Sequence, residues 1–150
     1  MFARLGATAR RATVGALVVG AVGYGGMLPA HAEGQFGTSI SAWAPGKTSR
    51  AWTDHNNDGW KTAVEMSRCS GNSRNVKGAY FELRRHRRLR PDVSYGNRAI
   101  IRSQCRGGRV DRAAWGDQTS GGYRFKLTKI NNGGGQSWYR WSAGTVNVYY

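Results

Sequence analysis

The sequence predicts an all-β fold: a single antiparallel β-sandwich, immunoglobulin-like or barrel-like, with one disulfide. Three observations support this prediction. Apolar and polar residues alternate along short segments, as in strands with one buried and one solvated face. Turn sequences rich in Gly, Asn, Asp and Pro separate these segments at the spacing of a sandwich. Helical periodicity is nearly absent, and two cysteines are present for one bridge.

The strands follow from the alternation along the chain. The clearest is 123–128, where Tyr123, Phe125 and Leu127 share one face. Residues 33–37 are expected to form a flexible leader ahead of the first strand. The expected strands are 38–43, 50–53, 61–68, 80–84, 98–105, 113–115, 123–128 and 146–150.

Cys69 and Cys105 are the only cysteines, and in an oxidising compartment such a pair forms a disulfide. Thirty-six positions separate them. Closing a loop of this length stabilises a fold by roughly 4 kcal/mol in the chain-entropy model. Cys69 has the opposite parity to Val64 and Met66, so either a bulge precedes it or the strand ends near Ser67. Cys105 is expected to face inward from the strand 98–105.

Residues 1–32 have the three-part layout of a secretory signal peptide. A basic start precedes a Gly-rich apolar run at 14–28, and a small-x-small cleavage site follows at 30–32. The run is too short and too rich in Gly to span about 30 Å of hydrocarbon. We therefore expect a secreted, extracellular protein with a mature domain of residues 33–150 and no transmembrane segment in that domain.

The mature domain is strongly basic. Removing Arg4, Arg10 and Arg11 from the 23 basic residues leaves 20 against 8 acidic residues, a net charge of +12. Such a field attracts polyanions, including teichoic acids, acidic polysaccharides, nucleic acid and anionic lipid surfaces. The alternative is that the charge serves solubility alone.

Residues 54–65 match the calcium-loop pattern D-x-[DN]-x-[DN]-G-x₅-E at every specified position. The flanks differ from those of an EF-hand, because Pro45 and Gly46 leave little room for an entering helix and 61–64 has the pattern of a strand. Two interpretations stay open: a calcium ion held between strands, and a hairpin turn rich in Asp, Asn and Gly. No cofactor is required. The calcium ligands would be Asp54, Asn56, Asp58, the backbone carbonyl of Trp60, and Glu65.

Residues 84–90 form the densest run of positive charge. Because Arg85 and Arg87 cannot stay in a core, the strand must end here, which makes 87–90 an exposed turn before Pro91. Such a turn suits phosphate or sulfate groups; the alternative is a solvated run that protects a sheet edge. Arg106, Arg109 and Arg112 extend the run only if the loops meet. The predicted ligand-binding residues are Arg84, Arg85, Arg87, Arg88 and Arg90.

The sequence holds six tryptophans, many for so small a domain. The segment Trp138-Tyr139-Arg140-Trp141 would present stacking faces to sugars or bases if it lay on the surface. The alternative is that these rings fill the sandwich core.

Glu82, Arg84 and His86 project from one strand face and resemble the Glu/Arg/His acid–base set of small secreted microbial ribonucleases. That family packs a substantial helix on its sheet and spreads the set over several strands. Neither feature is readable in this sequence.

A second resemblance rests on several segments: the export signal, Trp52-Thr53-Asp54 with Asn57-Asp58-Gly59, Cys69 with Cys105, Ala114-Trp115-Gly116-Asp117, and the segments 121–125 and 146–150. This layout resembles a group of small secreted single-disulfide β proteins from high-GC Gram-positive, actinomycete-like bacteria. The resemblance implies a non-catalytic extracellular role, similar in design to antibacterial factors or adaptor subunits of toxin particles, and carries over no functional residue.

Together these observations predict a secreted, non-catalytic binding protein. The basic residues 84–90 would engage an anionic envelope polymer, another polyanion or a secreted partner protein. One alternative is an antibacterial factor or an adaptor subunit of a toxin complex. A second alternative is a small secreted ribonuclease.

Overall fold

The computed structural model describes residues 34–57, 59–132 and 137–150. The signal peptide predicted for residues 1–32 and the calcium ligand predicted at Asp58 lie outside these residues. In the described part of the chain, no helix has both the length and the apolar character needed to cross a membrane.

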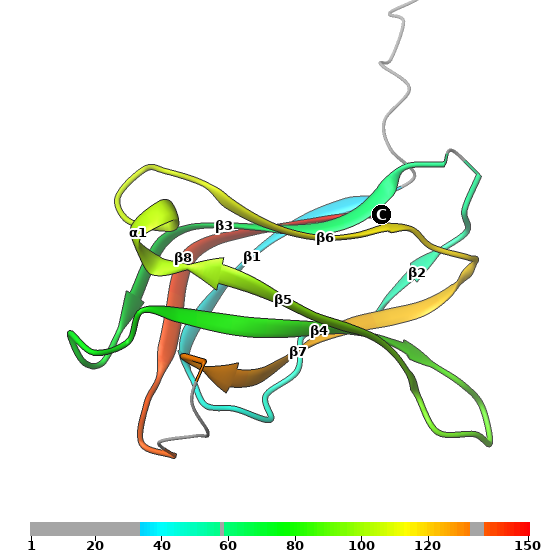
Figure 1. Ribbon diagram of the computed structural model, residues 1–150. Coiled ribbons are helices and arrows are strands. Elements are labelled where there is room, and N and C mark those ends of the chain that lie inside the picture. The colour runs from blue at the N-terminus through cyan, green and yellow to red at the C-terminus, as the bar shows by residue number, and fades with distance from the viewer. Residues whose placement is uncertain (1–33, 58, 133–136) are drawn as a thin grey trace, which may run out of the picture.

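Two antiparallel sheets of four strands each pack face to face (Figure 1). One sheet has the order β1-β8-β3-β6 and the other β2-β7-β4-β5. The predicted antiparallel β-sandwich with one disulfide is confirmed. The elements are β1 (Gln35–Trp43), β2 (Trp52–Asp54), β3 (Lys61–Gly71), β4 (Gly78–His86), β5 (Val93–Ile101), α1 (Arg102–Cys105), β6 (Asp111–Asp117), β7 (Gly121–Ile130) and β8 (Trp141–Tyr149).

The chain changes sheet at every connection between strands except the β4–β5 hairpin. This is the strand order of a jelly roll, the barrel-like form of a sandwich. Side chains also join the sheets where β5 lies beside β6: Arg98 Nε donates to the carbonyl of Ala114 and Trp115 Nε1 to that of Gly96, each at 2.9 Å. Because jelly rolls host unrelated functions, this fold alone assigns none.

The core follows the predicted alternation. Tyr123, Phe125 and Leu127 on β7 are fully buried, while the residues between them are half-buried. The rings of Phe125 and Phe81 meet edge to face with centroids 5.8 Å apart. Burial of side chains of this size contributes about 1.5–3 kcal/mol each, so the two inner faces hold the sheets together.

β3 continues through Cys69 to Gly71, so the alternative that it ends near Ser67 is wrong. The alternation of buried residues shifts by one position at Arg68, from Val64 and Met66 to Cys69. The backbone of Arg68 is left-handed, with φ of 53°. Opposite it, β8 changes parity across Gly144, so the two strands stay in register. Arg68 Nη2 donates to the Gly144 carbonyl at 3.2 Å, which fixes the kink.

The flexible leader expected at 33–37 is also wrong from Gln35 onward, where β1 begins and pairs with β8. Phe36 explains the order of this segment. Its ring packs edge to face on Trp52 at 5.8 Å, and the guanidinium of Arg50 lies 3.8 Å from the ring centroid. These contacts hold the start of the strand on the domain.

The strand expected at 98–105 ends at Ile101, and residues 102–105 form the single-turn helix α1. The chain turns here because the backbone N–H of Ile101 bonds to the Asp111 carboxylate, at 2.6 Å. Cys105 is buried as expected, but on the helix. The disulfide therefore joins β3 to α1, with the two Cα atoms 5.4 Å apart.

Candidate functional site

The predicted basic run lies at the tip of the β4–β5 hairpin. β4 ends at His86, and the exposed residues 87–90 follow it. Leu89 has a left-handed backbone with φ of 61° and is 97% exposed. The hairpin tip, defined here as residues 87–90, lies at the end of the sandwich opposite α1 (Figure 1).

The five predicted arginines separate into two groups. Arg84 Nε lies 2.6 Å from the Glu82 carboxylate. Arg85 donates to the Thr119 hydroxyl at 2.9 Å and to the Ser120 carbonyl at 2.6 Å, so it fastens β4 to the connection before β7. Within the described residues, the other three have no hydrogen bond or ion pair. These unpaired side chains are Arg87, Arg88 and Arg90.

The carboxylates that flank the tip are already paired. Asp92 accepts a hydrogen bond from Arg124 and lies 3.1 Å from His86 Nδ1. The hydrogen bond from Arg124 is the main reason that the pKa of Asp92 lies below its ordinary value; burial opposes this, and His86 adds to it. Sequence reasoning missed this pair because Arg124 is 32 positions from Asp92, and the two meet only when β4 pairs with both β5 and β7.

Glu82, in the middle of β4, is the other acidic residue of the hairpin. Burial raises its pKa, but hydrogen bonds from Ser94 and Arg84 and the charges of Arg84 and Lys126 outweigh burial. The pKa of Glu82 therefore lies below its ordinary value, and the group is a stable carboxylate with a cation beside it. Neither Glu82 nor Asp92 is available to neutralise the three tip arginines.

Arg106, Arg109 and Arg112 do not extend the tip. Arg106 and Arg109 lie around α1, at the other end of the hairpin strands. β4 has nine residues, which separates the two ends by about 30 Å. Arg112 instead lies 3.4 Å from the Glu65 carboxylate and over the Tyr149 ring.

The predicted calcium ligands are only partly brought together. The buried Asp54 carboxylate accepts hydrogen bonds from the Asn56 backbone at 2.8 Å and from Thr62 Oγ1 at 3.4 Å. Glu65 lies on β3, where Tyr149 donates to it at 3.0 Å. Trp60 is 54% exposed.

The bond from the Asn56 N–H to the Asp54 side chain forms a turn at residues 54–56, where Asn56 has a left-handed backbone with φ of 54°. Over residues 34–57, 59–132 and 137–150, no three His, Cys, Asp or Glu side chains lie close enough together to hold a metal ion. Since Asp58 is outside these ranges, calcium binding stays a prediction.

The tryptophan segment 138–141 belongs mostly to the core. Trp141 is fully buried and Tyr139 is 7% exposed, whereas Trp138 is 52% exposed. Trp52 and Trp115 are also buried. A continuous stacking surface is therefore not formed by this segment.

Glu82, Arg84 and His86, the ribonuclease-like set, all lie on β4, but they do not converge on a common position. Glu82 and His86 are four residues apart on β4, about 13 Å along an extended strand. Each is bonded to its own partner, Arg84 and Asp92 respectively. A general acid and a general base must reach the same substrate, and this spacing does not favour that arrangement.

Comparisons with models of protein families, with curated proteins and with solved structures find no match to this chain. The assignment of function therefore depends on the site itself.

Proposed function

We propose that this protein is a secreted, non-catalytic binding protein that attaches to an anionic polymer through the hairpin tip. One observation carries the proposal. Three tip arginines lack partners among the described residues, while Glu82 and Asp92, the two acidic residues of the hairpin, are paired with other cations. Unpaired like charges on one turn repel each other, and an anionic ligand relieves that repulsion.

The shape of the tip favours a polymer over a small molecule. A convex turn cannot enclose a ligand, and Leu89 at its apex is almost fully exposed. Guanidinium groups form paired hydrogen bonds with phosphate or sulfate, and successive anionic groups of a polymer can meet successive arginines. The net charge of +12 for residues 33–150 steers such a polymer towards the protein from any side.

The test is the affinity of the purified protein for long-chain inorganic polyphosphate at two salt concentrations. Three phosphate contacts predict a slope of about −2 in log K against log salt, so affinity should fall about 20-fold between about 50 and 200 mM salt. Reversing two tip charges, in Arg87→Glu with Arg88→Glu, should weaken binding about tenfold or more at the lower salt concentration.

The matched control reverses Lys47 and Lys61, which are exposed and lie outside the tip. This variant has the same net charge as the tip variant and should lose less than about threefold in affinity, since it loses only long-range attraction. Equal losses in both variants, or an affinity that does not depend on salt, would contradict the proposal. A secreted partner protein would then be the leading hypothesis for the tip.

A further inference from the structure

A basic cleft lies at the end of the sandwich opposite the hairpin tip, between the β3–β4 connection and the loop of α1. Its volume is about 630 Å³. Among the described residues, no carboxylate lines it. The polar side chains that line this basic cleft are Arg74, Lys77, Arg102, Ser103, Arg106 and Arg109.

Arg102 joins the two walls of the cleft. Its backbone N–H donates to the Lys77 carbonyl at 2.8 Å. Its Nη1 donates to the carbonyls of Ser73 and Val76, both at 3.1 Å. These bonds hold the guanidinium in one orientation, so its remaining N–H groups lie in a fixed position at the cleft.

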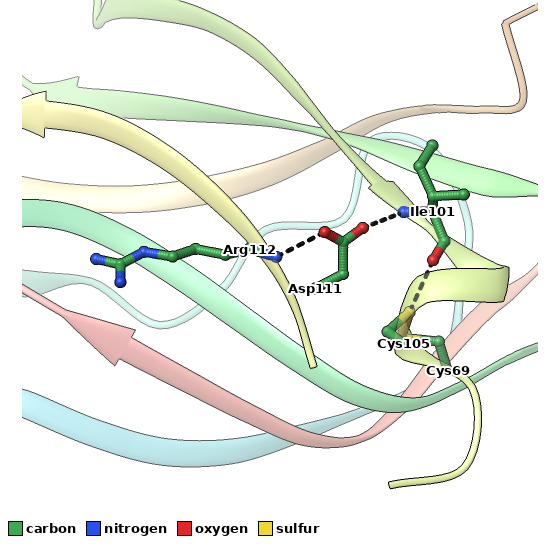
Figure 2. Close-up of a disulfide and its surroundings, with 5 residues drawn as sticks. All are labelled: Cys69, Ile101, Cys105, Asp111 and Arg112. Carbon is green, nitrogen blue, oxygen red and sulfur yellow. Dashed lines mark hydrogen bonds between the residues drawn. A yellow bond between two sulfur atoms is a disulfide. The ribbon is translucent and has the colours of Figure 1, made fainter. Parts of the chain in front are cut away.

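The loop that carries Arg106 and Arg109 is anchored at several points. The Cys69–Cys105 disulfide fixes the end of α1 to β3, and Asp111 accepts hydrogen bonds from the N–H groups before and after the loop (Figure 2). The backbone N–H of Arg68 also donates to the Gly107 carbonyl at 3.1 Å. A wall held in this way loses little conformational freedom when a ligand binds.

We propose that the basic cleft is a separate binding site for a small ligand that carries phosphate or sulfate groups. Five cations face one concavity, and walls of low dielectric concentrate their field there. The volume lies in the usual range of small-molecule sites and exceeds what one tetrahedral anion needs. The half-buried Ile101 adds apolar surface for the rest of the ligand. A diphosphate, or a small molecule bearing a phosphate or sulfate ester, fits this combination.

This inference does not rest on the proposed function of the hairpin tip. The two sites lie about 30 Å apart and differ in shape, so variants can separate them. The cleft variant is Arg106→Glu with Arg109→Glu, because both side chains are exposed and make no described contact that supports the fold. The tip variant, Arg87→Glu with Arg88→Glu, has the same net charge and is the matched control.

The experiment is isothermal titration calorimetry of the full chain with inorganic pyrophosphate, repeated with inorganic phosphate and sulfate. The cleft variant should bind pyrophosphate about tenfold or more weakly, since it loses two charge-assisted contacts. The tip variant should change by less than about threefold. A preference for phosphate over sulfate identifies a phosphorylated ligand, and the reverse preference identifies a sulfated one.

Three results would overturn the proposal: equal losses in both variants, unchanged affinity in the cleft variant, or no pyrophosphate binding by the parent up to about 10 mM. Unchanged thermal unfolding shows that the variants are folded. If the parent binds pyrophosphate in the cleft but no polyphosphate at the tip, the proposed function fails and this inference stands.

Discussion

The hairpin tip and the basic cleft are both rich in arginine but differ in how the fold holds them. The tip is convex, and its arginines have no partners in the described part of the chain. The cleft is concave, and its walls are tied by a disulfide, by Arg102 and by Asp111. Positive charge predicts attraction to anions in both places. Shape and anchoring decide whether the anion is a long flexible polymer or a small molecule.

Anchoring also sets the cost of binding. A side chain on a free turn loses rotamer entropy when it binds, up to about 2 kcal/mol for arginine. Several weak contacts must then act together, which suits a polymer with repeating charges. In the cleft, Arg102 is already fixed by Ser73 and Val76, so part of that cost is met on folding.

The largest effect is expected from removing the disulfide, with Cys69→Ser and Cys105→Ser together. The free energy of unfolding should fall by about 4 kcal/mol, because the unfolded chain regains the freedom of a 36-residue loop. Urea unfolding measures this change. Where the variant is still folded, pyrophosphate binding should be lost while polyphosphate binding at the tip is retained, because the bridge holds α1 and not the tip. An equal loss of pyrophosphate binding and polyphosphate binding would show that the cleft and the hairpin tip are not independent.

Asp111→Ala is the next largest change and tests whether the position of the loop matters more than charge. The variant loses two hydrogen bonds from backbone N–H groups, at Ile101 and Arg112, and should be less stable by about 2 kcal/mol. Removing an acidic residue near the cleft would strengthen anion binding if charge alone mattered. We expect weaker pyrophosphate binding by calorimetry, because the loop loses its anchor.

Asp111→Asn is the control, since its carbonyl oxygen can accept one of the two bonds. It should recover part of the stability and part of the affinity. Stronger binding in both variants would contradict the anchoring argument.

The same difference explains what the sequence could predict. The hairpin tip is one contiguous run in the sequence. That β4 must end close to this run follows from the rule that arginines cannot continue a buried face. The cleft draws Arg74 and Lys77 from one connection and Arg106 and Arg109 from another. The two connections meet only in the folded protein, where the disulfide and the end of β5 hold them side by side. No local sequence pattern therefore marks the site.

The errors in the predicted elements have similar causes. Residues 102–105 keep the parity of a strand, but the bond between Ile101 and Asp111 turns the chain into α1. Residues 35–37 belong to β1 instead of a flexible leader because Phe36 is held by Trp52, a contact between distant segments that no local pattern marks. Strand alternation in β4 and β7 was readable because it depends only on the chain's own period of two.

A smaller effect on stability is expected from lowering the pH, which protonates Asp92 at the base of the hairpin tip. The pKa of Asp92 is lowered in the folded protein, chiefly by the hydrogen bond from Arg124. Its contribution to stability is therefore complete well above the ordinary value of 3.8 and is lost as the pH falls through the lower folded value. The free energy of unfolding from urea titrations should fall over this range. Asp92→Asn should reduce the dependence, whereas the disulfide beside the cleft does not titrate. An unchanged pH profile in Asp92→Asn would show that this pair does not contribute.

The smallest effect on stability is expected from the tip arginines, whose removal should strongly weaken polyphosphate binding. Changing Arg87, Arg88 and Arg90 to Ala should alter the free energy of unfolding by no more than about 0.5 kcal/mol, because none has a described partner to lose. Arg85→Ala, two positions away, should cost about 1 kcal/mol, because it breaks hydrogen bonds to Thr119 and Ser120. Polyphosphate affinity should show the opposite order, with a large loss in the triple variant and a small loss in Arg85→Ala. If Arg85→Ala causes the larger loss of polyphosphate affinity as well as the larger loss of stability, the tip arginines do not bind the polymer, and the hairpin tip loses its assigned function while the cleft keeps its own.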